Sequence, residues 1–434
     1  MKAAFYTLGC KVNQYETEYM AELLKNAGFE IVPPEQEADY YIINSCTVTA
    51  TADQKTRQNV RKFKRKHPAS TVILTGCMPQ AFPDQAAALT EADIVLSNRS
   101  DSDILTLMNQ HATSKNRIIS IQPHDKDDPF DPCAISAFEE RIRAFVKIED
   151  GCDRFCSYCI IPTARGRVRS KQPADLQKEV AALAAGGIKE IVLVGINLSA
   201  YGKGEGFDLT DAVRICCENP DILRVRLGSL EPDHITDEII EKLSGFEKLC
   251  PQFHISLQSG CDKTLKSMNR HYTADEYRAL CQKLRAAFHD CTLTTDVMTG
   301  FHDETEADFQ KSLAFVHEIG FEKVHTFPYS ERQGTAASRR GDSVPKAEKE
   351  RRAGVMIAAA QEIRARYMHS LIGEQVTVLF ESCIGNDTYQ GYTKNYTPVR
   401  LHSPVNLIGS EKHVTLTGYD ATDDCCLASL STAH

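Results

Sequence analysis

Three cysteines, Cys152, Cys156 and Cys159, lie in the short segment GCDRFCSYC. The segment follows a predicted strand at residues 144–148, so the three thiols are expected to converge at the carboxyl end of that strand. Three thiolates on a four-iron cluster leave one iron without a protein ligand. The alternative is a zinc knuckle or three ordinary thiols, but zinc sites usually recruit a second cysteine pair or nearby histidines. The spacing therefore predicts an iron–sulfur cluster with an open iron.

A second set of cysteines, Cys10, Cys46 and Cys77, is spread over the first eighty residues in LGCKVNQYE, INSCTV and LTGCMPQ. Each follows a predicted strand, and the carboxyl ends of parallel strands share one edge of a sheet. Gly9 and Gly76 allow close approach of the backbone. Polar side chains that can hydrogen-bond a cluster follow in the same turns: Asn13, Gln14 and Gln80. We predict one metal site here; the alternative is three buried structural cysteines.

The chain alternates predicted strands and helices in two blocks. Residues 1–111 carry strands at 3–8, 40–44, 71–75 and 93–96, with helices at 16–27, 52–66 and 101–110, which predicts a parallel α/β domain of the flavodoxin-like type. Residues 112–143 are polar and contain HDKDDPFDP, so we predict a linker.

The second block, residues 144–369, carries six predicted strands at 144–148, 190–194, 223–227, 252–257, 292–297 and 323–327. Helices are predicted between them, and a charged helix at 346–369 ends the block. Six β/α units predict an open (β/α)6 barrel with its active site at the carboxyl ends of the strands. Residues 370–434 have short β segments separated by turns, which predicts a small antiparallel β-barrel of the kind often used for RNA.

Composition limits where the protein works and what it binds. The chain has 16 cysteines and no recognisable export signal, which predicts a reducing compartment, the cytoplasm. No apolar run approaches the roughly 18 residues of a membrane span, so we predict no membrane association. The formal net charge of −9 argues against binding nucleic acid through overall charge, so any such binding must be local.

The CxxxCxxC spacing after the first strand of a six-unit β/α domain resembles the radical S-adenosylmethionine (SAM) superfamily. Eight motifs together resemble the methylthiotransferase family over essentially the whole chain: YTLGCKVNQYETE, NSCTVTATAD, GCMPQ, GCDRFCSYCIIPTARGRVRS, LVGINLSAYG, RLGSLEPD, SLQSG and HTFPYSERQGT. Within the family, the LGCKVNQYE opening is most similar to the bacterial branch that acts on threonylcarbamoyladenosine in tRNA. The chain departs from the family at Met78-Pro79, at Thr163 and at His302-Asp303.

The resemblance implies three domains and two [4Fe-4S] clusters. An N-terminal methylthiotransferase domain would hold an auxiliary cluster on Cys10, Cys46 and Cys77. A central radical SAM domain would hold the second cluster on Cys152, Cys156 and Cys159, and a C-terminal TRAM domain would follow. One SAM would supply a methyl group and a second a radical that removes hydrogen from carbon 2 of the adenine at position 37 of tRNA. A flavodoxin- or ferredoxin-type protein would donate electrons.

Several other residues are candidates for binding SAM. They lie in the cluster loop and at the second, third and fourth strand ends: Tyr158, Gly195, Asn197, Ser229, Glu231 and Gln258. The alternative is that they are an ordinary loop aromatic and helix caps.

Basic residues are candidates for binding tRNA. They form a helix at 52–66, the stretch after the cluster loop and a tyrosine-rich part of the tail. The predicted tRNA contacts are Arg165, Arg167, Arg169, Lys394 and Arg400, with Tyr389, Tyr392, Tyr396 and Lys412 interleaved in the tail. A solvated basic face and tyrosines packed in a core are the alternatives.

We expect conversion of N6-threonylcarbamoyladenosine at position 37 to its 2-methylthio derivative. Three alternatives stay open: the same chemistry on an isopentenyl-type tRNA adenosine, the same chemistry on a ribosomal-protein side chain, or a metal-stabilised RNA-binding module without catalysis.

Overall fold

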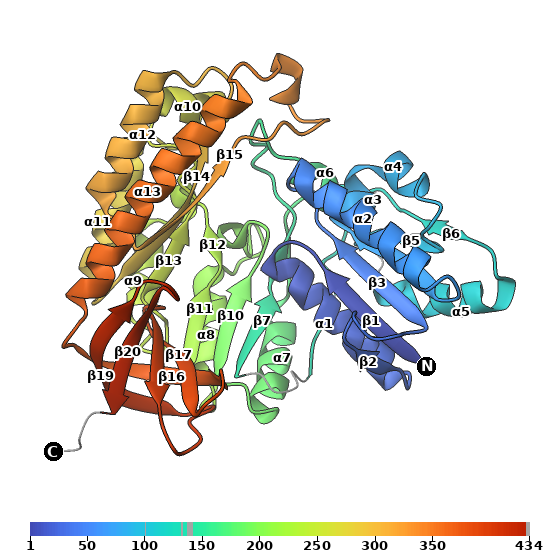
Figure 1. Cartoon of the computed structure of the whole chain (residues 1–434), viewed down its shortest axis with the longest axis horizontal. Coiled ribbons are helices and arrows are strands. Elements are labelled where there is room, and N and C mark those ends of the chain that lie inside the picture. The colour runs from blue at the N-terminus through green and yellow to red at the C-terminus, as the bar shows by residue number, and fades with distance from the viewer. Residues whose placement is uncertain (100, 132, 137–141, 431–434) are drawn as a thin grey trace.

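The computed structural model describes residues 1–99, 101–131, 133–136 and 142–430, arranged as three successive units (Figure 1). The N-terminal unit is built on a six-stranded parallel sheet of order β2-β1-β3-β4-β5-β6. Its elements are β1 (Lys2–Thr7), α1 (Lys11–Asn26), β2 (Glu30–Val32), β3 (Tyr40–Ser45), α2 (Ala50–Lys66), β4 (Thr71–Gly76), α3 (Cys77–Ala81), α4 (Pro83–Ala87), β5 (Ile94–Leu96), η1 (Asp101–Asp103), α5 (Ile104–Ser114) and β6 (Ile118–Ser120).

This strand order is the flavodoxin-like order, extended by one strand, which confirms the predicted fold. Helices cover both faces of the sheet. Residues of α1 and α5 such as Leu24 and Met108 pack on one face, and Val60 and Phe63 of α2 pack on the other. The predicted boundary at residue 111 is wrong, because α5 runs across it and β6 pairs with β5 inside the predicted linker.

The central unit carries six parallel strand positions in chain order, with β11 and β12 as two halves of the third. A bridge between Val225 and Leu249 joins the two sheets so formed. No pairing links β7 to β15 in the described chain, so the barrel is open, as predicted. The barrel strands are β7 (Arg143–Lys147), β10 (Glu190–Val194), β11 (Arg224–Leu227), β12 (Ser229–Leu230), β13 (Gln252–Ile255), β14 (Thr292–Thr299) and β15 (Lys323–Pro328). Two further short strands of this unit, β8 (Glu149–Asp150) and β9 (Arg169–Ser170), form a separate antiparallel pair.

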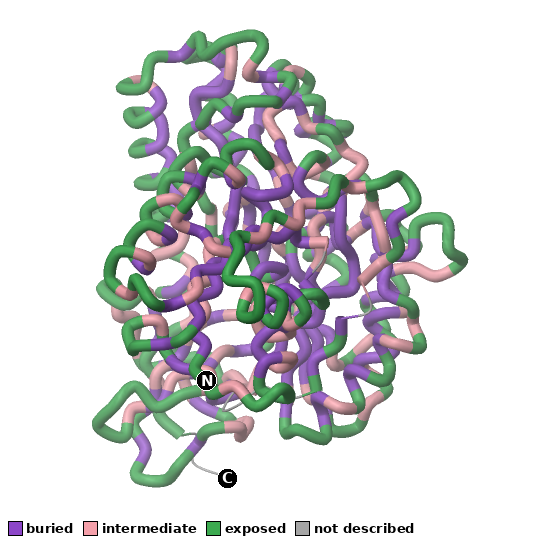
Figure 2. Tube along the Cα trace, turned by 90° about the vertical axis from the view of Figure 1, so that its right-hand side faces the viewer, coloured by how far each residue is buried: buried purple, intermediate pink, exposed green. Residues whose placement is uncertain are grey.

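Helices surround this barrel and enclose the main core. They are α6 (Ile161–Arg165), α7 (Pro173–Ala185), η2 (Leu198–Ala200), α8 (Leu209–Glu218), η3 (Pro232–His234), α9 (Asp237–Ser244), α10 (Asp262–Ser267), α11 (Ala274–Ala287), α12 (Glu306–Ile319), η4 (Ser338–Arg340) and α13 (Lys346–Ser370). Capping boxes begin α8, α11 and α12, with Thr273 and Glu276 as the pair on α11. Buried residues gather in the interior of the molecule, and exposed segments lie on its outside (Figure 2).

The C-terminal unit is a closed five-stranded barrel of order β16-β17-β18-β20-β19. Its strands are β16 (Gln375–Cys383), β17 (Thr388–Thr393), β18 (Pro398–His402), β19 (Glu411–Asp420) and β20 (Cys425–Leu430). The predicted barrel is confirmed, with one difference: β18 and β20 pair in parallel, so the barrel is not wholly antiparallel. No helix in the described ranges is both long and apolar enough to span a membrane.

The barrel docks on the amino-terminal edge of the central strands (Figure 1). Arg224, the first residue of β11, is fully buried there; its Nε donates to Glu411 Oε1 at 2.7 Å and its Nη1 to the Tyr392 carbonyl at 2.7 Å. A buried guanidinium requires such partners, because it has lost its water. The barrel therefore lies at the end of the sheet opposite the predicted cysteine sites.

Gly76 is a position where only glycine fits. Its φ is +91°, and a Cβ there would lie 2.4 Å from the Ser45 carbonyl oxygen. We expect Gly76→Ala to lower the free energy of unfolding of the iron-free protein by about 2–4 kcal/mol, since positive φ and overpacking both contribute. Gly28→Ala is the matched control, because φ is +85° and no atom of the described residues would lie within 4 Å of the added Cβ; it should cost about 1–2 kcal/mol. Urea unfolding followed by circular dichroism measures both; equal losses would contradict the clash.

Candidate functional site

The structure brings Cys10, Cys46 and Cys77 together at one sheet edge. They follow β1, β3 and β4, which are adjacent strands. A Cβ on Gly9 would lie 3.2 Å from Cys46 Sγ, so the first two turns touch. Burial raises the pKa of Cys77 to about 12, the Arg165 charge lowers it, and Cys46 and Cys10 raise it further. The three thiols thus lie within electrostatic reach of one another.

Asn13 ties these turns together. Its Nδ2 donates to the carbonyls of Leu8 at 3.0 Å and Ser45 at 2.9 Å, and to Asn44 Oδ1 at 3.2 Å. Its Oδ1 accepts from Cys10 Sγ at 3.4 Å. The side chain is buried, so these bonds hold the strand ends in place without competition from water. Asn13 was predicted to bond a cluster, and here it is the residue that organises the edge.

Arg165, at the end of α6, crosses from the central unit into this edge. Its Nε donates to Cys77 Sγ at 3.2 Å, and its Nη2 donates to Asn13 Oδ1 at 2.9 Å and Glu16 Oε2 at 2.9 Å. The side chain is fully buried. The prediction that Arg165 contacts tRNA is therefore wrong, because α1 and the first cysteine edge cover the guanidinium.

Glu16 is the carboxylate that receives these cations. It is buried, it pairs with Arg165, and Lys147 Nζ lies 3.0 Å from its Oε1. Asp150 joins the network at 3.4 Å from Lys147 and 3.3 Å from Arg169. The surrounding cations hold the pKa of Asp150 well below its usual range despite its burial. This network locks the N-terminal unit to the central unit.

Cys152, Cys156 and Cys159 form the second group. The paired strands β8 and β9 bracket the stretch that contains them, with the Cys152 amide donating to the Gly166 carbonyl at 3.0 Å. The Cys159 amide donates to the Cys156 carbonyl at 2.9 Å. Burial raises the pKa of Cys159 to about 12, and the neighbouring Cys156 raises it further. The predicted convergence of these thiols on one loop is what the structure shows.

Arg270 is the cation of the second group. Its Nη1 donates to Cys156 Sγ at 3.3 Å, and its Nη2 pairs with Glu231 Oε2 at 2.5 Å. Tyr272 and the Ser256 carbonyl complete its partners. Each cysteine group therefore has one buried arginine that bonds a thiol, and Glu231, predicted to bind SAM, lies beside the second group through Arg270.

Polar atoms without partners mark the neighbouring strand ends. In the described chain, buried Asn197 Oδ1, Gln258 Oε1 and Glu149 Oε1 have no hydrogen-bond partner. Burial raises the pKa of Glu149 well above its usual range, while its Oε2 accepts from the Asn197 amide at 2.7 Å. A Cβ on Gly195 would lie 2.6 Å from that same oxygen, so glycine is needed to seat Glu149. Unpaired polar atoms of this kind fit a polar ligand such as SAM.

Tyr158 and Ser229 complete the predicted SAM set. Tyr158 packs edge-on against Phe301 with ring centroids 6.1 Å apart, in an apolar cluster beside the cysteines. Ser229 begins β12 and is exposed.

The cysteines do not form a single-ion site. No group of three or more His, Cys, Asp or Glu side chains among the described residues is arranged to hold one metal ion. A tetrahedral zinc site draws its ligands to one point, whereas each cysteine of a four-iron cluster binds a different iron. Two sets of three nearby thiols with basic partners therefore fit iron–sulfur clusters.

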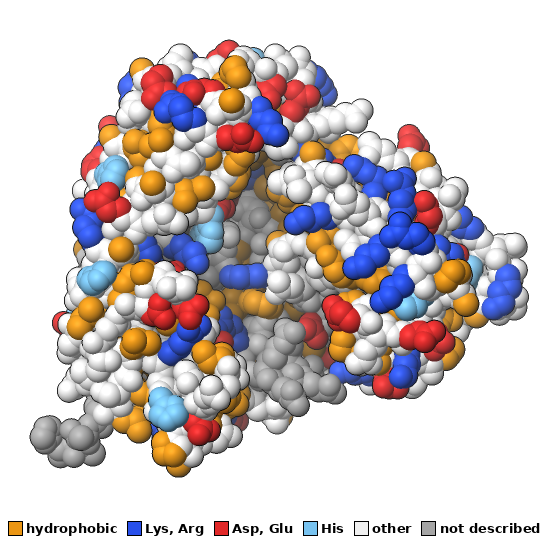
Figure 3. All heavy atoms as spheres, in the orientation of Figure 1, with side chains coloured by type: hydrophobic (Ala, Val, Ile, Leu, Met, Phe, Trp, Pro, Cys, Tyr) orange, Lys and Arg blue, Asp and Glu red, His pale blue; other side chains and the backbone are white. Residues whose placement is uncertain are grey.

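A hollow opens between the N-terminal and central units, with basic and histidine side chains inside it (Figure 3). Phe145 lies on its wall, because Ala144 and Val146, its neighbours along β7, pack into the core instead. Across the barrel, His254 Nε2 lies 3.4 Å from Asp296 Oδ2, and the His254 ring is 5.9 Å from that of His325. The cysteine edges thus border a cavity lined by titratable groups.

The remaining tRNA candidates have mixed outcomes. Arg167 is exposed, 3.2 Å from Asp153, and Lys394 is exposed at the edge of the barrel. Arg169 is mostly buried against Asp150, and Arg400 pairs with Asp423. These four stay predictions.

The tail tyrosines face inward. Tyr392 and Tyr396 stack at 4.6 Å, and the Arg226 guanidinium lies 4.4 Å from the Tyr396 ring centroid. Tyr389 belongs to the barrel core. These rings therefore serve docking and packing, which was the alternative for them.

Helix α2 presents the clearest basic surface. Lys and Arg side chains gather over it in the space-filling view (Figure 3). The helix begins four residues after Cys46, and Asp53 in its first turn is bound by Arg332 at 2.7 Å. Its exposed cations are Lys55, Arg61, Lys62, Arg65 and Lys66.

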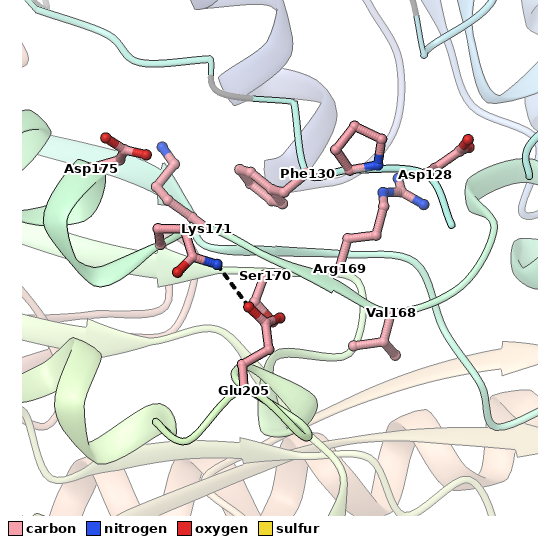
Figure 4. Close-up of a pocket in the computed structure, with 10 residues that line it drawn as sticks. Asp128, Phe130, Val168, Arg169, Ser170, Lys171, Asp175 and Glu205 are labelled. Carbon is pink, nitrogen blue, oxygen red and sulfur yellow. Dashed lines mark hydrogen bonds between the residues drawn. The ribbon is translucent and has the colours of Figure 1, made fainter. Parts of the chain in front are cut away.

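A separate cavity of about 350 Å³ lies beside the β8–β9 pair (Figure 4). Two charged side chains on its wall already have partners. Lys171 forms an ion pair with Glu179, and Glu205 accepts a hydrogen bond from Gln172 at 2.7 Å. None of the described residues that line it is a cysteine. We therefore assign it no part in the site.

Sequence reasoning missed Glu16, Lys147, Glu149 and Arg270. Lys147 had a signal, since it is a lone cation in an apolar strand and so needed a buried partner. Arg270 had none, because it follows α10 at a distance from any strand end.

Comparison with known proteins finds matches to both the N-terminal and the central unit. Residues 2–97 match the family described as Uncharacterized protein family UPF0004, and residues 146–316 match the Radical SAM superfamily. Threonylcarbamoyladenosine tRNA methylthiotransferase MtaB of Thermotoga maritima is 39% identical over 90% of this chain and 89% of that protein. The Bacillus subtilis MtaB is 36% identical over 94% and 91%. The tRNA-2-methylthio-N(6)-dimethylallyladenosine synthase of Clostridium novyi is 34% identical over 95% and 93%.

Among solved structures, the radical SAM methyltransferase TsrM from Kitasatospora setae matches with a TM-score of 0.55 at 13% identity, covering 75% of this chain and 72% of that one. This likeness supports the fold. The open central barrel, the two cysteine groups and the family match together define a radical SAM protein with an added N-terminal α/β domain. The chain belongs to the tRNA methylthiotransferase family.

The contribution of the buried ion network around Glu16 can be measured as a change in the free energy of unfolding. We expect Arg165→Met to lower the free energy of unfolding of the iron-free protein by about 3–5 kcal/mol, because it leaves buried carboxylates short of a partner. Arg167→Met is the control: its side chain is 53% exposed, so the loss should stay below about 1 kcal/mol. Urea unfolding measures both, and a small loss for Arg165→Met would contradict its place in the network.

Proposed function

We propose that this chain converts N6-threonylcarbamoyladenosine at position 37 of tRNA to its 2-methylthio derivative. The observation that carries the proposal is the pair of three-cysteine groups at two sheet edges, bordering one hollow and joined by Arg165. Three relatives at 33–39% identity carry the name of this activity. The identity to a dimethylallyladenosine synthase is 34%, so that nucleoside is the second candidate.

The cysteine groups have distinct parts in this proposal. Cys152, Cys156 and Cys159 would hold the [4Fe-4S] cluster that cleaves SAM, and Cys10, Cys46 and Cys77 would hold the auxiliary cluster. When bound, SAM and the clusters supply the radical chemistry and the methylthio group. The protein does the rest: Arg270 and Arg165 each donate to one cysteine and compensate negative charge, and burial keeps water from both edges.

Polar atoms at the strand ends bind SAM in this scheme. Asn197 and Gln258 have buried side-chain oxygens without partners, and both lie at carboxyl ends of central strands. Glu231 is fixed by Arg270, so its position beside Cys156 does not depend on the ligand. Tyr158 supplies an apolar wall, since it packs among Phe301 and its neighbours.

We infer that the partner is tRNA, reached in the cytoplasm, with a flavodoxin- or ferredoxin-type protein as electron donor. The relatives' names support the tRNA. The basic face of α2 supports a local electrostatic contact in a chain of net charge −9.

Removing single cysteines separates the two clusters. We expect Cys156→Ala to abolish 5′-deoxyadenosine formation and methylthiolation, because the cluster that cleaves SAM is lost. Cys10→Ala should keep SAM cleavage and abolish methylthiolation. Cys383→Ala is the control, since that thiol is exposed in the barrel, remote from both groups. Product analysis by mass spectrometry measures the three.

Iron analysis completes this test. We expect about eight irons in the wild type and about four in each site variant. Zinc in place of iron would support an RNA-binding module instead, and methylthiolation by Cys10→Ala would rule out the auxiliary role.

The α2 surface can be tested by salt dependence. We expect the triple variant Lys62→Glu, Arg65→Glu and Lys66→Glu to bind tRNA more weakly. The slope of log Kd against log salt concentration should fall by about two to three. The control reverses three exposed lysines elsewhere, Lys178, Lys283 and Lys346, so that net charge changes equally. Equal effects from the two sets would show a general charge effect rather than a contact surface.

A further inference from the structure

Lys11 holds an unusual place in the hollow. It begins α1 directly after Cys10, and its Nζ lies 5.8 Å from the centre of the Phe145 ring on the wall of the barrel. The next residue, Val12, packs with Val192 and Val194 on that same inner face. The first turn of α1 thus carries a lysine from the auxiliary cysteine edge onto the interior of the central barrel.

The Lys11 ammonium lies within electrostatic range of charged groups on several strands of the central barrel. Its charge contributes to lowering the pKa of His325 on β15, and Arg143, Arg226 and Glu190 act on Lys11 in turn. The residue remains exposed to solvent in the hollow. It therefore faces the space that a nucleoside placed beside the auxiliary cysteines would occupy.

Unlike the cations around it, Lys11 has no acidic side chain within ion-pair distance among the described residues. Arg143 is paired with Glu381 and Arg226 with Glu190. Lys147 is held by Glu16. Across the described ranges, no hydrogen bond or ion pair engages Lys11 Nζ. An ammonium that keeps access to the hollow and has no ion-pair partner in the described chain is suited to receive an anion from a ligand.

We propose that Lys11 binds the carboxylate of the threonylcarbamoyl group and so selects that nucleoside. This rests on the proposed function. The threonine carboxylate is the one fixed anion of the modified base, whereas the dimethylallyl group named for the Clostridium novyi relative is uncharged and apolar. Lys11 is a positioning and specificity residue; the transferred group and the radical come from elsewhere.

A neutral substrate provides the sharpest test. Two anticodon stem-loop RNAs are made, one with threonylcarbamoyladenosine and one with the same group as its carboxamide. We expect the cluster-loaded wild type to bind the carboxylate RNA at least about tenfold more tightly than the amide RNA, as a charged hydrogen bond requires. Lys11→Met should bring this ratio near unity, and Lys11→Arg should retain the preference. Fluorescence anisotropy measures the affinity of each of the three proteins for both RNAs.

Lys323→Met is the matched control. The charge of Lys323 also lowers the pKa of His325, but Lys323 begins β15 at the amino-terminal edge of the central sheet, near the C-terminal barrel. It should keep the wild-type ratio. The proposal is overturned if the wild type binds both RNAs equally, if Lys11→Met keeps the preference, or if Lys323→Met loses it. Loss of about four irons in Lys11→Met would also overturn it, because Lys11 would then act through Cys10.

Turnover is scored separately on the carboxylate RNA. A wild type that binds it with the expected preference but forms no methylthio product would contradict the proposed function while supporting the carboxylate contact. Formation of the methylthio product without a binding preference for the carboxylate RNA would support the proposed function and contradict the carboxylate contact.

Discussion

The buried ion network centred on Glu16 determines how the two halves of the site meet. Arg165 and Lys147, both from the central unit, converge on one carboxylate of α1, and Asp150 balances the excess positive charge. Charges without water are tolerated only when every partner is in place, so the network specifies one relative placement of the two units. That placement brings the cysteine edges of two independent parallel sheets to the same hollow. Arg165 then adds its bond to Cys77, and the link between the units becomes part of the site.

Buried ion pairs and hydrogen bonds also join the opposite, amino-terminal end of the central sheet to the C-terminal barrel. Arg143, Arg224 and Arg226 lie near the amino ends of β7 and β11, and groups from the barrel receive them. The barrel is therefore needed to neutralise buried charge in the central unit as well as being a candidate surface for RNA. Its stacked tyrosines belong to this contact, which explains why their alternation with cations in the sequence resembled an RNA-binding pattern. Cation–π packing and base stacking select the same residue types.

Much of the architecture followed from local patterns. Apolar runs located the long strands, and a thiol after each of β1, β3 and β4 predicted a shared edge, because parallel strands end together. The short strands β2 and β6 were missed, since three residues carry too little alternation to be recognised. The parallel pairing of β18 with β20 was equally out of reach, because strand order inside a barrel depends on contacts that are distant in the chain.

The sequence by itself determined the two cysteine groups, the order of the domains and the family. Cys152, Cys156 and Cys159 are close because they share one loop, and no folding of the rest of the chain is needed to predict that. Only the tertiary structure decided the destinations of the long cationic side chains. Arg165 was predicted to meet phosphate and is buried on Glu16, whereas Lys11 was not singled out and lies in the hollow with no ion-pair partner among the described residues. The reason is physical: a flexible cation goes to whichever carboxylate or cavity the neighbouring domain presents, and spacing along the chain does not record which domain that is.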